Sequence, residues 1–189
     1  MKEFHFAPLL PVPGTYIALD ASLWGGGGIL VVGHRVVEWF ATQWTAFDHA
    51  VHHIAREDSG NMSYWESLTI LIACREWLVR FLGMPVVLKS GSLSALRLAL
   101  KLGSRSKNLN LIGYEFALDQ ALGRYQIKLL EHVPGVSNIT PDGLSRQFAP
   151  TPSAFPIACL NAIECCVKPR DSFFWKCTKN TAASIWYYK

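Results

Sequence analysis

Apolar and polar residues alternate in several short runs of this chain, and in other runs apolar residues recur at helical spacing. The short β-rich runs predict strands: residues 15–21, 29–32, 36–40, 85–89 and 125–131. Apolar positions three and four residues apart predict helices: residues 63–82, 93–102, 109–122 and 140–146. The predicted order is β-β-β-α-β-α-α-β-α, and glycine-containing turns favour an antiparallel arrangement of the first three strands.

Proline positions divide the chain into three parts. Three prolines precede Gly14, so residues 1–14 are expected to form an extended lead-in, which a linker from an upstream domain would also resemble. Residues 15–149 contain all the predicted strands and helices. Four further prolines interrupt residues 150–189, which are expected to be a loosely structured tail.

Three acidic residues lie at the ends of predicted elements. Asp20 ends the first strand, Glu66 lies near the start of the first long helix, and Asp142 lies near the start of the last. Carboxylates gathered from separate elements at one end of a sheet suit Mg²⁺. Each also has a purely structural interpretation: a turn for Asp20, a capping box with Ser63 for Glu66, and the helix dipole for Asp142.

Residues 15–146 resemble the ribonuclease H domain of retroelement reverse transcriptases, including tyrosine-recombinase-type retrotransposons. Four segments carry the resemblance: residues 19–28, 65–68, 86–96 and 132–146. The last is the most specific, with a His, a Pro-Gly pair, an Asn, an Asp and Leu-Ser-Arg in order. The resemblance implies an α/β ribonuclease-H-like fold, with a five-stranded mixed sheet flanked by helices, and cleavage of the RNA strand of an RNA–DNA hybrid.

The resemblance also implies a site of four carboxylates that bind two Mg²⁺ ions, with Mn²⁺ as a possible substitute. Asp20, Glu66 and Asp142 match the first, second and fourth positions. The third position, after the strand at residues 85–89, is Gly91, and residues 77–114 contain no Asp or Glu. The two-ion site is therefore expected to be compromised and hydrolysis weak. A non-catalytic remnant that binds nucleic acid or is purely structural stays open as the alternative.

By the same resemblance, His132 is expected to assist proton transfer or product release, as a group with a near-neutral pKa can, and Asn138 to fix its loop near the nucleic acid. Lys101, Arg105 and Lys107 form the best candidate cluster for contacts with phosphates, and an ordinary solvated face is an equal alternative for them. The expected partners are an RNA–DNA hybrid and an upstream reverse transcriptase domain.

Three other patterns point to chemistry less strongly. The glycines at residues 25–28 lack the context of a phosphate-binding loop, so a tight hairpin with close approach of the backbone to a ligand is favoured. The histidines at residues 49–53 and the four cysteines after residue 155 lack metal-ligand spacing. Aromatic and basic residues mix in the tail, as they do in single-strand-binding segments, but chance composition is the favoured interpretation.

Composition narrows the class of protein. Half of the 189 residues are hydrophobic, 17% are charged, and the formal net charge is +4, which excludes an intrinsically disordered chain. The sequence shows neither an apolar run of membrane-spanning length nor the apolar core of a signal peptide at its start. Five cysteines, an odd number, indicate a reducing setting. We therefore expect an intracellular protein, cytoplasmic or nuclear, that does not associate with membranes.

Overall fold

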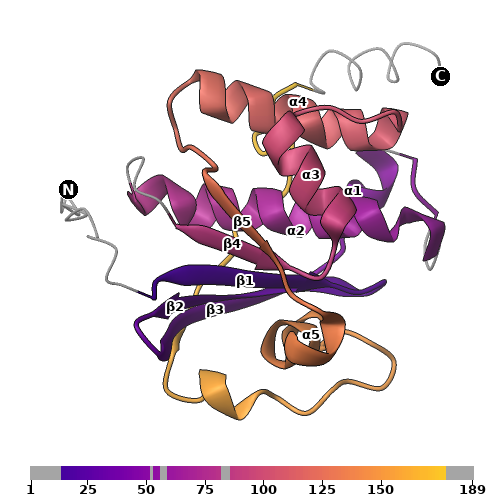
Figure 1. The fold of residues 1–189 in the computed structure, drawn as a ribbon. Helices are drawn as coiled ribbons and strands as arrows, with labels where there is room; N and C mark the ends of the chain where they lie inside the picture. The colour runs from indigo at the N-terminus through magenta and orange to yellow at the C-terminus, as the bar shows by residue number, and fades with distance from the viewer. Residues whose placement is uncertain (1–13, 52, 56–58, 82–85, 178–189) are drawn as a thin grey trace, which may run out of the picture.

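The computed structural model describes residues 14–51, 53–55, 59–81 and 86–177. A sheet of six strands lies at its centre (Figure 1): β1 (Tyr16–Ala21), β2 (Gly25–Val32), β3 (Arg35–Gln43), β4 (Val87–Ser90), β5 (Leu129–His132) and β6 (Ile163–Glu164). The strand order is β5-β4-β1-β2-β3-β6. The first three strands pair antiparallel, whereas β4, β5 and β6 each pair parallel with their neighbour. The predicted mixed sheet is confirmed, with a sixth strand that the sequence did not predict.

Helices cover both faces of this sheet. On one face lie α2 (Met62–Glu76), α3 (Leu93–Lys101) and α4 (Lys107–Ala121), and on the other lies α5 (Ile139–Ser145) (Figure 1). A short helix, α1 (Ala46–Val51), lies between β3 and α2. The described residues also form four single-turn 3-10 helices: η1 (Ser59–Asn61), η2 (Leu78–Phe81), η3 (Gly135–Ser137) and η4 (Ile157–Cys159). The end of the helix expected at residue 82 lies outside the described residues.

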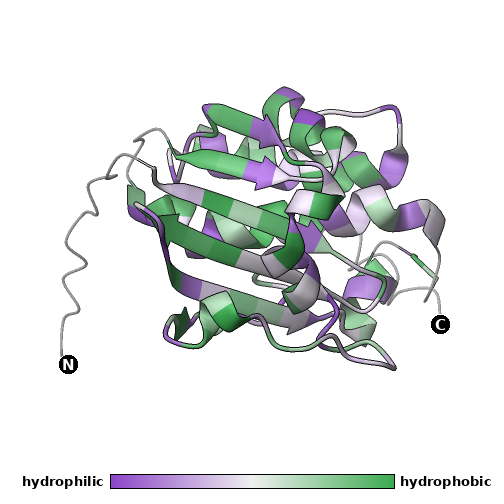
Figure 2. Cartoon of the chain, turned by 60° about the horizontal axis from the view of Figure 1, so that its bottom comes forward, coloured by the Kyte–Doolittle hydropathy of each residue, from purple (hydrophilic) through white to green (hydrophobic). Residues whose placement is uncertain are grey.

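The core lies between α2 and the central strands. Leu68 and Ile72 of α2 are fully buried, as are Ile17 and Leu19 of β1. Hydrophobic residues predominate along the central strands, as Figure 2 shows. Because α2 packs against the sheet, α3 and α4, every residue from Ser67 to Arg75 is buried. This packing fixes α2, and with it the acidic residue near its start.

The four glycines at residues 25–28 form the first half of β2, not the predicted tight hairpin. A Cβ on Gly26 would lie 2.6 Å from Oγ1 of Thr69 in α2, and one on Gly27 would lie 2.5 Å from the backbone N of Ser145 in α5. Real Cβ atoms do not approach so closely, so the glycines let helices sit directly on both faces of the strand. The close approach that the sequence suggested is therefore to helices, and it positions α5 against the sheet.

The described part of the predicted loose tail, residues 150–177, packs against the rest of the chain. It supplies β6, which pairs with β3, and it buries Trp175. Arg170 is also buried, and its guanidinium donates hydrogen bonds of 2.9–3.0 Å to the carboxylate of Asp48 and one of 2.8 Å to Thr42 Oγ1. The sequence pattern did not predict this packing, because these hydrogen bonds of Arg170 join residues more than 120 positions apart in the chain.

Candidate functional site

Asp20 is the second-to-last residue of β1, at the end of the sheet where α5 packs against it. Its Oδ2 accepts a hydrogen bond of 3.0 Å from Ser145 Oγ, and its Oδ1 accepts one of 3.3 Å from Asn138 Nδ2. The same Asn138 nitrogen donates to the carbonyl of Leu19 at 2.9 Å. Two side chains from the α5 segment therefore hold the carboxylate of Asp20 in one orientation.

Glu66 faces the end of β1 from the second turn of α2. Its carboxylate accepts a hydrogen bond from the backbone amide of Ala21 and a long one, 3.4 Å, from Ser90 Oγ on β4. The capping-box interpretation is wrong, because α2 begins at Met62 and the hydroxyl of Ser63 pairs with that of Ser94 at 2.8 Å. Glu66 is thus aimed at the sheet and has no part in capping its helix.

Asp142 lies in the first turn of α5, closer to solvent than the other two carboxylates. Its side chain is 40% exposed and forms an ion pair with Arg146, with 2.7 Å between Nε and Oδ1. Ser145 Oγ contacts the Asp142 carbonyl oxygen at 2.9 Å as well as the carboxylate of Asp20. The structure therefore brings all three predicted acidic residues to one end of the sheet, with Asp142 already partnered by an arginine.

The electrostatics of this end of the sheet reflect crowded negative charge. The pKa of Glu66 is raised to about 8, chiefly by burial and in addition by the negative charges of Asp20 and Asp142. Burial also raises the pKa of Asp20 to about 6, although the hydrogen bonds from Ser145 and Asn138 oppose the shift. Two carboxyl groups that ionise reluctantly form a site that a bound cation would stabilise.

Gly91 lies where a fourth carboxylate would complete the cluster. It follows Ser90, which pairs with Leu19 of β1 on one side and with His132 of β5 on the other. A Cβ on Gly91 would meet only the carbonyl oxygen of Val133, at an ordinary 3.6 Å. The backbone therefore has room for a side chain beside Asp20, and the sequence does not provide one.

The serines on either side of Gly91 have local roles. Ser90 Oγ accepts a hydrogen bond of 3.1 Å from the backbone N of Ser92, and Ser92 Oγ caps α3 by accepting one of 3.3 Å from the amide of Ala95. Both neutral hydroxyl groups accept hydrogen bonds within the turn after β4, and that of Ser90 also donates the long hydrogen bond to Glu66. They do not replace a carboxylate.

His132 lies at the end of β5, exposed and next to Gly91. Its Nε2 is 3.0 Å from the carbonyl oxygen of Gly91. Because a carbonyl can only accept, Nε2 carries the proton in this contact, which leaves Nδ1 of the neutral ring as an acceptor. His132 therefore lies beside Gly91, where β5 pairs with the end of β4.

The predicted nucleic-acid contacts divide into two groups. Asn138 is only 3% exposed, so its side chain positions Asp20 and cannot contact a bound strand. Lys101, Arg105 and Lys107 are all exposed where α3 ends and α4 begins, as a surface for phosphates requires. Sequence reasoning missed Ser145 and Arg146, although both lie in the Leu-Ser-Arg segment that carried the resemblance.

The other candidate metal ligands do not assemble. His49 Nδ1 lies 3.2 Å from the carbonyl oxygen of Ile54, and the ring packs edge-on against Trp65, while the neighbouring His52 lies outside the described residues. All five cysteines are free. Among the described residues, no group of three or more His, Cys, Asp or Glu side chains is arranged to hold a metal ion.

The carboxylates fit the implied Mg²⁺ pair only in part. Asp20 and Glu66 offer the oxygen ligands that Mg²⁺ prefers, and burial, together with neighbouring negative charge, raises the pKa of both carboxyl groups. Asp142 is engaged by Arg146, and Gly91 offers no ligand. The donor set therefore suits one cation at Asp20 and Glu66, and it does not suit two.

Comparison with solved structures places this arrangement in a known fold. The chain is similar to RNase H1 from the halophilic archaeon Halobacterium salinarum NRC-1, with a TM-score of 0.52 and 18% sequence identity, over 70% of this chain and 95% of that one. The chain has a ribonuclease-H-like fold. No protein-family model matches the sequence, and no curated protein matches it.

Membrane insertion was not expected from the sequence. None of the helices in the described part of the chain combines the length and the apolarity needed to cross a bilayer.

Proposed function

We propose that this chain is the ribonuclease-H-like domain of a retroelement reverse transcriptase, which binds RNA–DNA hybrid and cleaves its RNA strand slowly. The fold supports the first half of this proposal, and the motif at residues 132–146 supports the retroelement origin. The observation that carries the proposal is the convergence of Asp20, Glu66 and Asp142 beside an open position at Gly91. The proposed domain spans residues 15–149, with residues 150–177 packed against it.

In the proposed hydrolysis, the residues at the site would have three roles: cation binding, positioning of a carboxylate, and proton transfer. Asp20 and Glu66 would hold Mg²⁺ or Mn²⁺, which would polarise a phosphate oxygen and lower the pKa of the attacking water. Asn138 and Ser145 keep the carboxylate of Asp20 in place. His132 can give a proton to the leaving oxygen or take one, because it is exposed and its ring nitrogen Nδ1 is available.

Binding of the hybrid would draw on the cationic cluster formed by Lys101, Arg105 and Lys107. Phosphate contacts supply affinity without sequence preference, and the 2′-hydroxyl groups of the RNA strand distinguish the hybrid from DNA. An upstream reverse transcriptase domain would be the natural covalent partner of such a domain. We place its activity inside the cell, in the cytoplasm or nucleus, where a retroelement meets its RNA.

A second candidate function is binding of hybrid without hydrolysis. The ion pair between Asp142 and Arg146 favours it, because the guanidinium occupies a carboxylate that a second cation would need. The same ion pair would not prevent binding, since it leaves Lys101, Arg105 and Lys107 exposed.

Affinity measurements separate hybrid recognition from non-specific attraction to charge. Labelled RNA–DNA hybrid, duplex DNA and duplex RNA of one sequence would be titrated with the chain and followed by fluorescence anisotropy. We expect the hybrid to bind most tightly. The triple variant with Gln at residues 101, 105 and 107 should bind all three more weakly and with a shallower salt dependence. Equal affinity for the three wild-type complexes would contradict hybrid recognition.

A further inference from the structure

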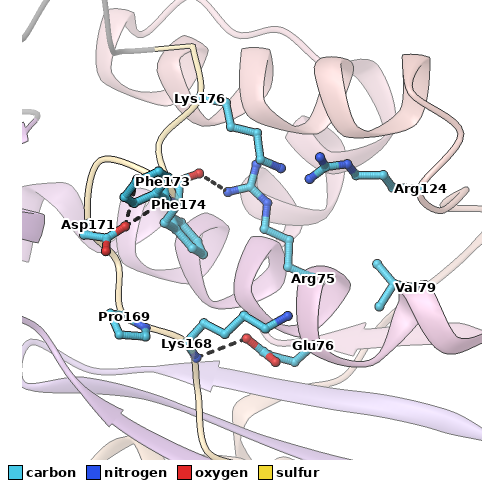
Figure 3. Close-up of a pocket in the computed structure, with 10 residues that line it drawn as sticks. All are labelled: Arg75, Glu76, Val79, Arg124, Lys168, Pro169, Asp171, Phe173, Phe174 and Lys176. Atoms are coloured by element: carbon cyan, nitrogen blue, oxygen red, sulfur yellow. Dashed lines mark hydrogen bonds between the residues drawn. The ribbon is translucent and has the colours of Figure 1, made fainter. Parts of the chain in front are cut away.

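A second hollow lies at the opposite end of α2 from the carboxylates. It encloses about 430 Å³ between the end of α2, the segment after α4 and the tail, within the range of small-ligand sites. Arg75 lines it, nine residues after Glu66 in the same helix, so the two sites are about 14 Å apart along the helix axis. The hollow is therefore separate from the candidate active site (Figure 3).

Four cationic side chains line this hollow. Figure 3 shows the head groups of Arg75, Arg124 and Lys176 close together, and all three contact the buried carboxylate of Asp119. Arg75 and Lys176 approach it to 2.5 and 2.7 Å, whereas Arg124 is 3.3 Å away and 43% exposed. Arg124 is thus the member of the cluster with most capacity for another anion.

Lys168 provides the fourth cation. Its side chain is exposed, and its ammonium forms no ion pair within the described part of the chain. The carboxylates lining the hollow are already in use: Glu76 accepts a hydrogen bond from the backbone N of Lys168 at 3.1 Å, and Asp171 accepts one from that of Phe173 at 2.7 Å. Lys168, together with the part of the Arg124 guanidinium that Asp119 does not engage, can therefore meet a phosphate.

Phe173 adds an aromatic surface to the rim of the hollow. Its side chain is 77% exposed, while the hydrogen bond from its backbone to Asp171 fixes the turn that carries it. The next residue, Phe174, is buried and stacks under Arg75, with 4.5 Å between the guanidinium carbon and the ring centroid. An exposed ring held on an ordered turn beside cations is the combination that single-strand-binding sites use.

We propose that this hollow binds one nucleotide unit of a single-stranded nucleic acid. The phosphate would contact Lys168 and Arg124, and the base would lie against the ring of Phe173. Both cations line the hollow, and stacking on a phenyl ring does not depend on which base is present. This reverses the sequence-based interpretation of the aromatic and basic residues of the tail, and it does not depend on the proposed nuclease function.

The test is the affinity of the full chain for a short labelled oligouridylate and oligothymidylate over a series of salt concentrations. Phe173→Ala should weaken binding about tenfold, as expected from the loss of one base–aromatic stack, and Phe173→Trp should restore it. Lys168→Gln and Arg124→Gln should each lower the salt slope by about 0.7, the value for one phosphate contact on a single strand. The matched control is Arg35→Gln, an exposed cation at the start of β3, which should change neither quantity.

Three results would overturn the proposal. The first is unchanged affinity in Phe173→Ala. The second is an equal fall in salt slope in Arg35→Gln, which would show attraction to net charge only. The third is binding of an acidic peptide that depends on Phe173 while oligonucleotide binding does not, which would assign the hollow to a protein partner. The affinity of the same variants for RNA–DNA hybrid should stay within about twofold of the wild-type value. A failure of the single-strand proposal can therefore be distinguished from a failure of the proposed function.

Discussion

Replacing Gly91 with Asp should raise the rate of the proposed hybrid cleavage. The substitution is sterically permitted, because a Cβ at this position meets only the Val133 carbonyl oxygen, at 3.6 Å. It adds a carboxylate at the end of β4, directly next to β1 and Asp20. The new oxygen atoms would join Asp20 and Glu66 in binding a cation, which supplies the ligand that the present site lacks.

The magnitude of the effect has two parts. Without a cation, the new charge is harmful: neighbouring strands lie about 4.8 Å apart, and two like charges about 5 Å apart repel by about 3 kcal/mol at an effective dielectric constant of 20. Protonation of Glu66, whose pKa is already raised to about 8, relieves part of this repulsion. With Mg²⁺ the sign reverses, and a gain of only about 1.4 kcal/mol in the transition state gives a tenfold faster reaction.

The assay pairs cleavage with stability. Gly91→Asp should cleave the RNA strand of a labelled hybrid more than tenfold faster than wild type. Mg²⁺ should also raise the melting temperature of Gly91→Asp by more than it raises that of the wild-type chain. Gly91→Asn adds the same shape without the charge, and Gly135→Asp adds a charge where no atom lies within 4 Å of the new Cβ. Neither control should gain activity. Equal rates for wild type and Gly91→Asp would show that another residue already supplies the ligand and would refute the reasoning.

Three further predictions follow from the same structure. Arg170→Met should lower the free energy of unfolding by about 3–5 kcal/mol in urea titrations, because it leaves Asp48 buried without its partner; adding Asp48→Leu should recover much of the loss, and no recovery would contradict the ion-pair explanation. The pKa of Glu66 is raised, so its contribution to stability is full below about pH 4.5 and is lost as pH rises through about 8; Glu66→Gln should remove this decline, worth at most a few kcal/mol at about 1.4 kcal/mol per pKa unit, and an unchanged pH profile of melting temperature would contradict it. Asn138→Ala should raise the pKa of Asp20 above about 6, because the variant loses a hydrogen bond that lowers this pKa in the wild-type chain. NMR titration of the carboxyl groups measures this pKa, and a downward shift would contradict the prediction.

The sequence predicted the elements near the site better than the contacts between them. Asp20, Glu66 and Asp142 could be placed because each lies at the end of an element whose apolar pattern is regular. Asn138 was only half understood: its role in the loop was predicted, but its burial depends on how α5 packs against β1. A single sequence does not reveal how closely α5 and β1 pack.

The tail shows where pattern reasoning fails. Prolines predicted a loose segment, and no pattern along the chain distinguishes Asp48 and Asp119 from solvated surface charges. Both acids are fully buried because each pairs with cations far away in the sequence: Asp48 with Arg170, and Asp119 with Arg75 and Lys176. In the linear sequence nothing distinguishes these residues from solvated charges, because the ion pairs form only when the chain folds.

The measurement that tests the central claim most directly is strand-specific cleavage by the wild-type chain. An RNA–DNA hybrid labelled on both strands would be incubated with the chain and Mg²⁺, beside the Glu66→Gln variant, in which one side chain that can bind the cation is neutral but of nearly the same shape. The account predicts slow cleavage of the RNA strand alone, absent without Mg²⁺ and absent in Glu66→Gln. Cleavage of the DNA strand, or cleavage by Glu66→Gln at the wild-type rate, would contradict it, as would the complete absence of cleavage by the wild-type chain.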